Sequence, residues 1–172
     1  MLTIKDSVHD PIEVEGSQIY GYTNHPDRVT ANISSPWDGL STTNNGDIIS
    51  EAQTALQGLR ENKFFGPYVM YIPSAYEGKM DEDYQEGSGD TRTVRPRLLQ
   101  LSGLNQIKVA DRLPNDNVVI AQLTRDVVDL AIAQDISNVQ WEPGHGMQRL
   151  FKTMAVWVPR VKSDYDGNSG VA

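Results

Sequence analysis

The chain has 172 residues, enough for one domain, and it contains no cysteine, which excludes disulfide bonds, thiolate zinc sites and a cysteine nucleophile. Its net charge of -8 disfavours general nucleic-acid binding, because phosphate contacts need clustered lysine and arginine. No apolar run approaches the roughly 20 residues of a transmembrane helix, so no membrane partner is predicted.

Residues 1–45 carry no long periodic segment, and proline and glycine recur throughout them. We expect this part to be an extended N-terminal segment that wraps the core, with short extended pieces at 12–15 and 28–33.

The first strong signal is a helix over residues 47–62, where apolar residues recur at helical spacing. Asn44 is placed to cap its start, and Asp47 suits the positive end of the helix dipole. The Gly66-Pro67 pair then breaks the chain, and residues 68–72 have the composition of a buried strand.

Two shorter helices are predicted next. Ser74 and Glu77 form a capping-box pattern that predicts a helix over about 75–84. Pro96 and Gly103 bracket another over 95–101.

The rest of the chain is predicted to form strands, separated by turns at 114–117 and 142–146. A polar stretch at 162–172 is expected to be a flexible tail. Helices come first and strands are grouped late, which favours an α+β fold. The predicted strands are 106–110, 118–123, 127–134 and 147–158.

The stretch DLAIAQDIS at 129–137 alternates in a way that places Leu130, Ile132 and Gln134 on one face of a strand. The small alanines on the other face leave room for a close-packed layer such as a helix. Asp135 is expected to end the strand and to satisfy backbone donors in a turn. Trp141 and Trp157 flank the return strand as core or interface anchors.

No catalytic residue, cofactor or metal site is predicted. His9, His25 and His145 show no zinc-site spacing, and no phosphate-binding or nucleophile motif is present. His25 and Asp27 could place an imidazole beside a carboxylate, but a turn in which His25 caps a backbone group is favoured. The acidic residues at 81–90 lack the pattern of a calcium loop and indicate a solvated loop.

An acidic and a basic cluster are adjacent in the sequence and are candidates for inter-subunit contacts. The two can pair within the fold or between neighbouring subunits. The acidic residues are Asp81, Glu82, Asp83 and Glu86, and the basic ones are Arg92, Arg95 and Arg97.

Several motifs occur in an order that resembles one known family. They are GYTNHP ahead of Trp37, the helix DIISEAQTALQGLREN followed by GPYVMYIPSAYEGKM, then VRPRLLQLSGLNQIKVADRL, and finally DLAIAQDISNVQW with RLFKTMAVWVPRV. Together they resemble the C-terminal portion, with the axial domain, of encapsulin-like phage major capsid proteins of the Hong Kong 97 phage-type capsid fold.

The resemblance implies an axial-domain-like α+β core at 46–161 that includes the closing strands. The N-terminal arm, extended loop and spine helix of full members are not recognisable, so we expect a fold lacking them. The implied protein is not an enzyme. It is a structural protein of the virion, assembled in the host cytoplasm.

The implied partner is the chain itself. Its copies form five-fold or six-fold rings that enclose a phage genome without specific binding. One alternative is an encapsulin nanocompartment around protein cargo. A second is a small cytosolic hydrolase or binding module with a site near His25.

Overall fold

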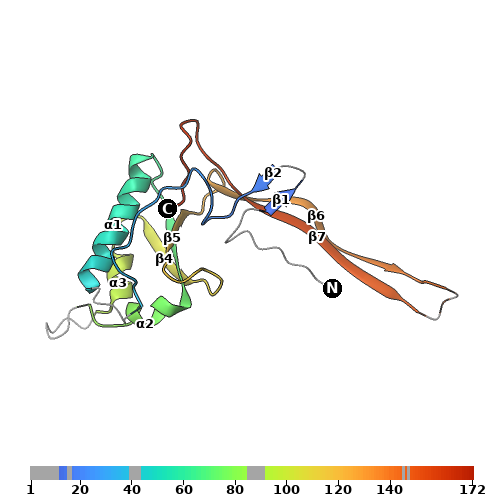
Figure 1. Ribbon diagram of the computed structural model, residues 1–172, viewed down its shortest axis with the longest axis horizontal. Coiled ribbons are helices and arrows are strands. Elements are labelled where there is room, and N and C mark those ends of the chain that lie inside the picture. The colour runs from blue at the N-terminus through green and yellow to red at the C-terminus, as the bar shows by residue number, and fades with distance from the viewer. Residues whose placement is uncertain (1–11, 15–16, 39–43, 85–91, 145, 147) are drawn as a thin grey trace.

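The computed structural model describes residues 12–14, 17–38, 44–84, 92–144, 146 and 148–172. It has a compact part, built of helices around a small sheet, from which a long two-stranded ribbon extends (Figure 1). The chain is therefore α+β, as the order of its patterns predicts.

The main helix, α1 (Asn45–Glu61), confirms the prediction for this segment. The Asp47 carboxylate accepts the backbone N–H of Asn44 at 3.3 Å, one half of a capping box. Its apolar face is buried, including Ile48, Leu56 and Leu59. This face covers one side of the sheet.

The sheet has the order β4-β3-β5. Its central strand β3 (Tyr68–Ile72) pairs in parallel with β4 (Leu104–Val109) and antiparallel with β5 (Val119–Gln122). One face packs on α1 and α3 (Val94–Leu99) to form the main core, while a smaller apolar cluster lies on the other face.

The helix predicted over 75–84 is shorter than expected. A 3₁₀ turn at Ser74–Tyr76 leads into α2 (Glu77–Met80), and the Ser74 side chain caps neither. The chain then becomes extended, because Asp83 forms a bridge with Thr93. That pairing competes with continued helix and ends it early.

The N-terminal part contains a small hairpin of β1 (Ile12–Val14) and β2 (Ser17–Ile19). Residues 28–33, where a short extended piece is expected, are not part of any strand. Val29 and Ile33 of this segment pack against the main core. A Cβ added to Gly58 of α1 would lie 3.1 Å from the Val29 side chain.

The expectation of a flexible tail at 162–172 is wrong. Gln122 donates its N–H to Gly170 O at 2.9 Å, and Ile120 and Ala172 exchange backbone hydrogen bonds of 2.7 and 2.8 Å. Val171 is fully buried. The segment packs there because β5 has an edge whose backbone groups need partners.

The ribbon consists of β6 (Val128–Trp141) and β7 (Leu150–Val161), paired antiparallel. The prediction that the first strand ends near Gln134 is wrong, since β6 continues to Trp141. The prediction of a layer packed on its alanine face is also wrong: Ala131 and Ala133 are exposed. The ribbon extends away from the helices (Figure 1).

Candidate assembly interface

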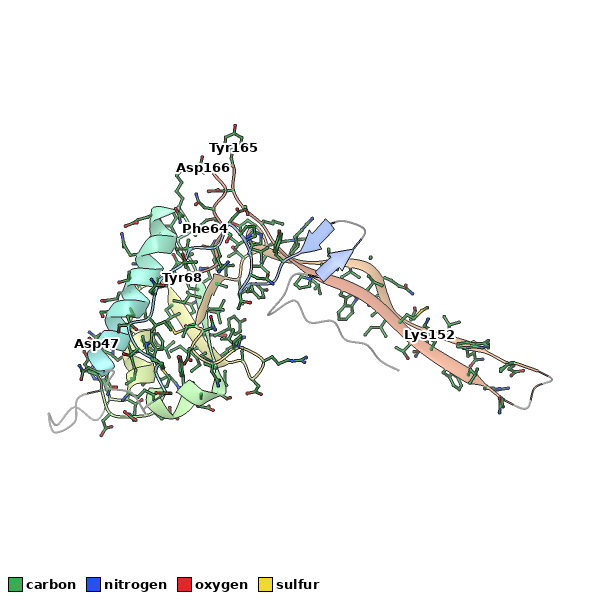
Figure 2. The ribbon with its side chains drawn as sticks, viewed as in Figure 1. Asp47, Phe64, Tyr68, Lys152, Tyr165 and Asp166 are labelled. Atoms are coloured by element: carbon green, nitrogen blue, oxygen red, sulfur yellow. The ribbon has the colours of Figure 1, made fainter. Side chains whose placement is uncertain are left out.

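The ribbon carries most of the exposed large hydrophobic side chains in the described part of the chain. Side chains project from the ribbon into open space, with Lys152 on its outer half (Figure 2). A two-stranded hairpin is marginally stable in water, and contiguous exposed apolar surface marks an interaction site. The side chains are Leu130, Ile132, Ile136, Val139, Trp141, Leu150, Phe151, Val156 and Trp157, each between 43% and 67% exposed.

Both ribbon tryptophans are exposed, Trp141 by 45% and Trp157 by 44%, whereas Trp37 is 2% exposed. The sequence leaves both a core role and an interface role open for Trp141 and Trp157. Neither side chain lies in the core of its own chain, so the core role is wrong. Their large apolar surfaces are available to a partner.

An ion cluster fixes the base of the ribbon. The Asp129 carboxylate accepts two hydrogen bonds from Arg160, at 2.9 and 2.6 Å, and lies 2.8 Å from Lys162 Nζ. These hydrogen bonds, chiefly the one from Arg160, hold the pKa of Asp129 well below its usual range. Lys162 also donates to Arg125 O at 2.8 Å, which ties the ribbon to the preceding loop.

Two bulges interrupt β6 at the polar middle of DLAIAQDIS. Ile132 pairs with Trp157 and Gln134 with Val156, so Gln134 lies on the opposite face from Ile132, contrary to the simple alternation. Asp135 does satisfy a backbone donor: its Oδ1 accepts the Ile136 N–H at 2.7 Å. The site is a bulge rather than the predicted turn.

The acidic and basic clusters come together within one chain. Arg95 lies 3.4 Å from the Asp81 carboxylate and 3.9 Å from that of Glu77. Glu82 pairs with Lys79 at 2.6 Å. Arg95, Asp81 and Glu82 therefore have ion-pair partners within the chain.

The remaining members of these clusters also have contacts in the chain. Arg97 lies over the Tyr84 ring, 5.9 Å from its centroid, and donates to Gln100 at 2.9 Å. Arg92 O accepts the Tyr84 N–H at 2.9 Å. Asp83 belongs to the bridge described above, and Glu86 lies outside the described residues.

Replacing Arg95 with alanine is expected to lower the free energy of unfolding by only about 0.2–1 kcal/mol, because its carboxylate partners are solvent-exposed. Urea denaturation at low and high salt measures this, and the difference should shrink at high salt. A loss of several kcal/mol, unchanged by salt, would contradict the surface assignment.

His25 forms the turn that the sequence favours. Its Nδ1 accepts the Asp27 N–H at 3.2 Å, while the Asp27 carboxylate accepts the Ser163 hydroxyl at 2.6 Å. The imidazole is thus occupied by backbone and the carboxylate by Ser163. His9 and His145 lie outside the described residues, among which no group of three histidine, cysteine or acidic side chains could hold a metal.

The free energy of unfolding should decrease as the pH drops through about 6.5, the ordinary pKa of histidine. Burial lowers the pKa of His25, so the unfolded chain takes up a proton before the folded chain does. The urea midpoint should therefore decrease between neutral pH and about pH 5.5, and less in His25→Gln than in the unmodified chain. Equal decreases in both proteins would count against this role for His25.

Comparison with solved structures defines the class of fold. Over 81% of its length the chain matches the crystal structure of a virus-like particle from Pyrococcus furiosus, with a TM-score of 0.59 and 21% sequence identity. It spans 53% of that chain, about half its length. The chain therefore has a capsid-like α+β fold.

The chain belongs to a family described as of unknown function, DUF6260, whose model matches residues 5–172. No curated protein matches it. In the part of the chain that the structure describes, no helix combines the length and apolar character needed to cross a membrane.

Proposed function

We propose that this chain is a subunit of a self-assembling protein shell. The observation that carries the proposal is the exposed apolar ribbon on a chain with a capsid-like fold. A subunit that works alone gains nothing from such a surface, whereas a shell subunit covers it on assembly. The ion cluster of Asp129, Arg160 and Lys162 supports this by fixing the ribbon where it leaves the core.

At a finer level, we propose a phage major capsid protein, or part of one, that occupies the virion after assembly in the host cytoplasm. The chain then represents the axial-domain-like core with its closing strands. The net charge of -8 suits a shell that encloses DNA by confinement rather than by specific binding.

Ring contacts around five-fold or six-fold axes are heterologous, so two different faces of the subunit must meet. The ribbon provides one such surface. The charged surface with Arg95 and Asp81 is a second candidate, as a rim that sets register more than affinity.

Negative-stain electron microscopy of the purified chain, with sedimentation velocity, tests the proposal. Closed shells or rings are expected, and a monodisperse monomer or small closed oligomer would overturn it. For shells formed in cells, nuclease-protected DNA inside supports the phage capsid, whereas protein cargo without DNA supports a nanocompartment.

A further inference from the structure

The apolar surface of the ribbon falls into two patches. The near patch, close to the compact part, comprises Leu130, Ile132, Trp157 and Pro159. The far patch, toward the tip, comprises Val139, Trp141, Leu150 and Val156. All eight residues are exposed.

The register places the two patches on opposite faces. Residues directly paired across a ladder share a face, and successive residues of one strand alternate. In the near patch, Ile132 pairs with Trp157, an odd-numbered position of β7. In the far patch, Trp141 pairs with Leu150, an even-numbered one. Because β7 has no inserted residue, odd and even positions of β7 lie on opposite faces.

The apolar patch changes face because the apolar residues occur at different positions along the strands, and not because of a net shift in the register between the strands. Each of the two bulges adds one residue to β6, so beyond Ser137 the strand alternates in its original phase. Across this interval the apolar residues move from even positions such as Ile132 to odd positions such as Val139. Adjacent Val156 and Trp157 make the same change on β7.

The other half of each face is more polar. Behind the near patch lie the ion cluster around Asp129 and the smaller apolar pair of Ala131 and Val158. Behind the far patch, Thr153 donates to Asn138 at 2.6 Å, with Gln140 further along, and Phe151 is the apolar exception. Each face therefore has one half that is richer in large exposed apolar side chains than the other, in opposite order, with Lys152 beside Val139 at the far patch.

We infer that the ribbon of each copy lies between the ribbons of two further copies, with the near patch of one on the far patch of the next. This rests on the proposed function, since the partner is a second copy of the chain. A contact of the near patch with itself would form a closed pair and leave the far patch in water. A near-to-far contact covers both patches and continues from copy to copy, as a shell requires.

Each near-to-far contact brings together one tryptophan and three smaller apolar side chains from each copy. A fully covered aromatic side chain buries about 150–250 Å². Trp141 and Trp157 are 45% and 44% exposed, so each offers roughly 100 Å² to its contact. Stable complexes bury about 800 Å² on each partner, so the two patches would form the apolar centre of a contact that flanking ribbon side chains complete.

A mixing experiment with two variants tests the inference. Ile132→Asp disables the near patch and Leu150→Asp the far patch. In sedimentation velocity the unmodified chain should form large assemblies and each variant alone should remain monomeric. An equimolar mixture should form 1:1 dimers of twice the monomer mass and nothing larger. Each dimer joins the intact near patch of one variant to the intact far patch of the other, and no further intact pair of patches remains.

Gln140→Asp is the matched control, an exposed substitution outside both patches, and should assemble normally. Circular dichroism checks that the variants fold, and Ile132→Thr with Leu150→Thr repeats the test with strand-compatible side chains. A far-patch variant that dimerises alone, or a mixture without dimers, overturns the inference. Variants that assemble like the unmodified chain overturn it while leaving the proposed function standing. A monomeric unmodified chain overturns both.

Discussion

Replacing Trp37 with alanine is expected to lower the free energy of unfolding by about 3–5 kcal/mol, the usual cost of deleting a buried large aromatic side chain. The indole is 2% exposed and lies against the Tyr76 ring, with 5.9 Å between ring centroids. Its Nε1 donates to Glu51 Oε2 at 2.8 Å. Because Glu51 Oε1 also accepts the Ser34 N–H at 2.8 Å, Trp37 helps to hold the N-terminal segment on α1.

Trp157→Ala provides a matched comparison, with the same substitution at a ribbon position that is 44% exposed. It should change the free energy of unfolding of the monomer by about 0.5 kcal/mol or less. It should nevertheless weaken assembly, because it removes the largest side chain of the near patch. Urea denaturation and sedimentation measure the two effects separately. Similar losses of monomer stability in both variants would contradict the division between core and interface.

Local patterns were sufficient to predict the main helix and the central strand of the compact part. The helix over 47–62 was predictable because its apolar spacing and its capping residues agree, and both are properties of neighbouring residues. The strand at 68–72 was predictable because its apolar run is bounded by Pro67 and Pro73. Both predictions needed only interactions within a few residues.

The ribbon and the C-terminal segment were not predictable in the same way. Apolar alternation indicates that a strand face is covered, but not whether the cover comes from the same chain. The small alanines of this strand therefore suggested a layer packed in the fold, whereas Ala131 and Ala133 are exposed. The bulges at Gln134 and Asp135 depend on the register with β7, which the sequence of β6 alone does not contain.

The polar composition of residues 162–172 suggested a loose tail for a related reason. Serine, aspartate and glycine are typical of loops, but this segment is held by backbone pairing with distant residues. Ser169 N–H donates to Asp27 O at 3.0 Å, and Val29 N–H donates to Val171 O at 2.9 Å. Gly170 permits the close approach, since a Cβ there would lie 2.7 Å from Val127 Cγ1.

Val171→Asp is expected to lower the free energy of unfolding by about 3–5 kcal/mol, because it leaves an uncompensated charge in the interior. Val171 is fully buried beside Val119 and Ala121 of β5. If the segment detaches to bring the carboxylate into water, the Ile120 and Val29 amides lose their partners in this segment. Their hydrogen exchange should then accelerate, while that of α1 should change less.

Tyr165→Asp is the control within the same segment. Tyr165 lies at the tip of the C-terminal loop and points into solvent (Figure 2), with a side chain that is fully exposed. The control should leave both the urea midpoint and the Ile120 exchange rate unchanged. If Val171→Asp were equally silent, residues 169–172 would not be part of the core. If it alone destabilises the chain, the C-terminal segment is a structural part of the core, held beside β5 by its bridge and backbone hydrogen bonds.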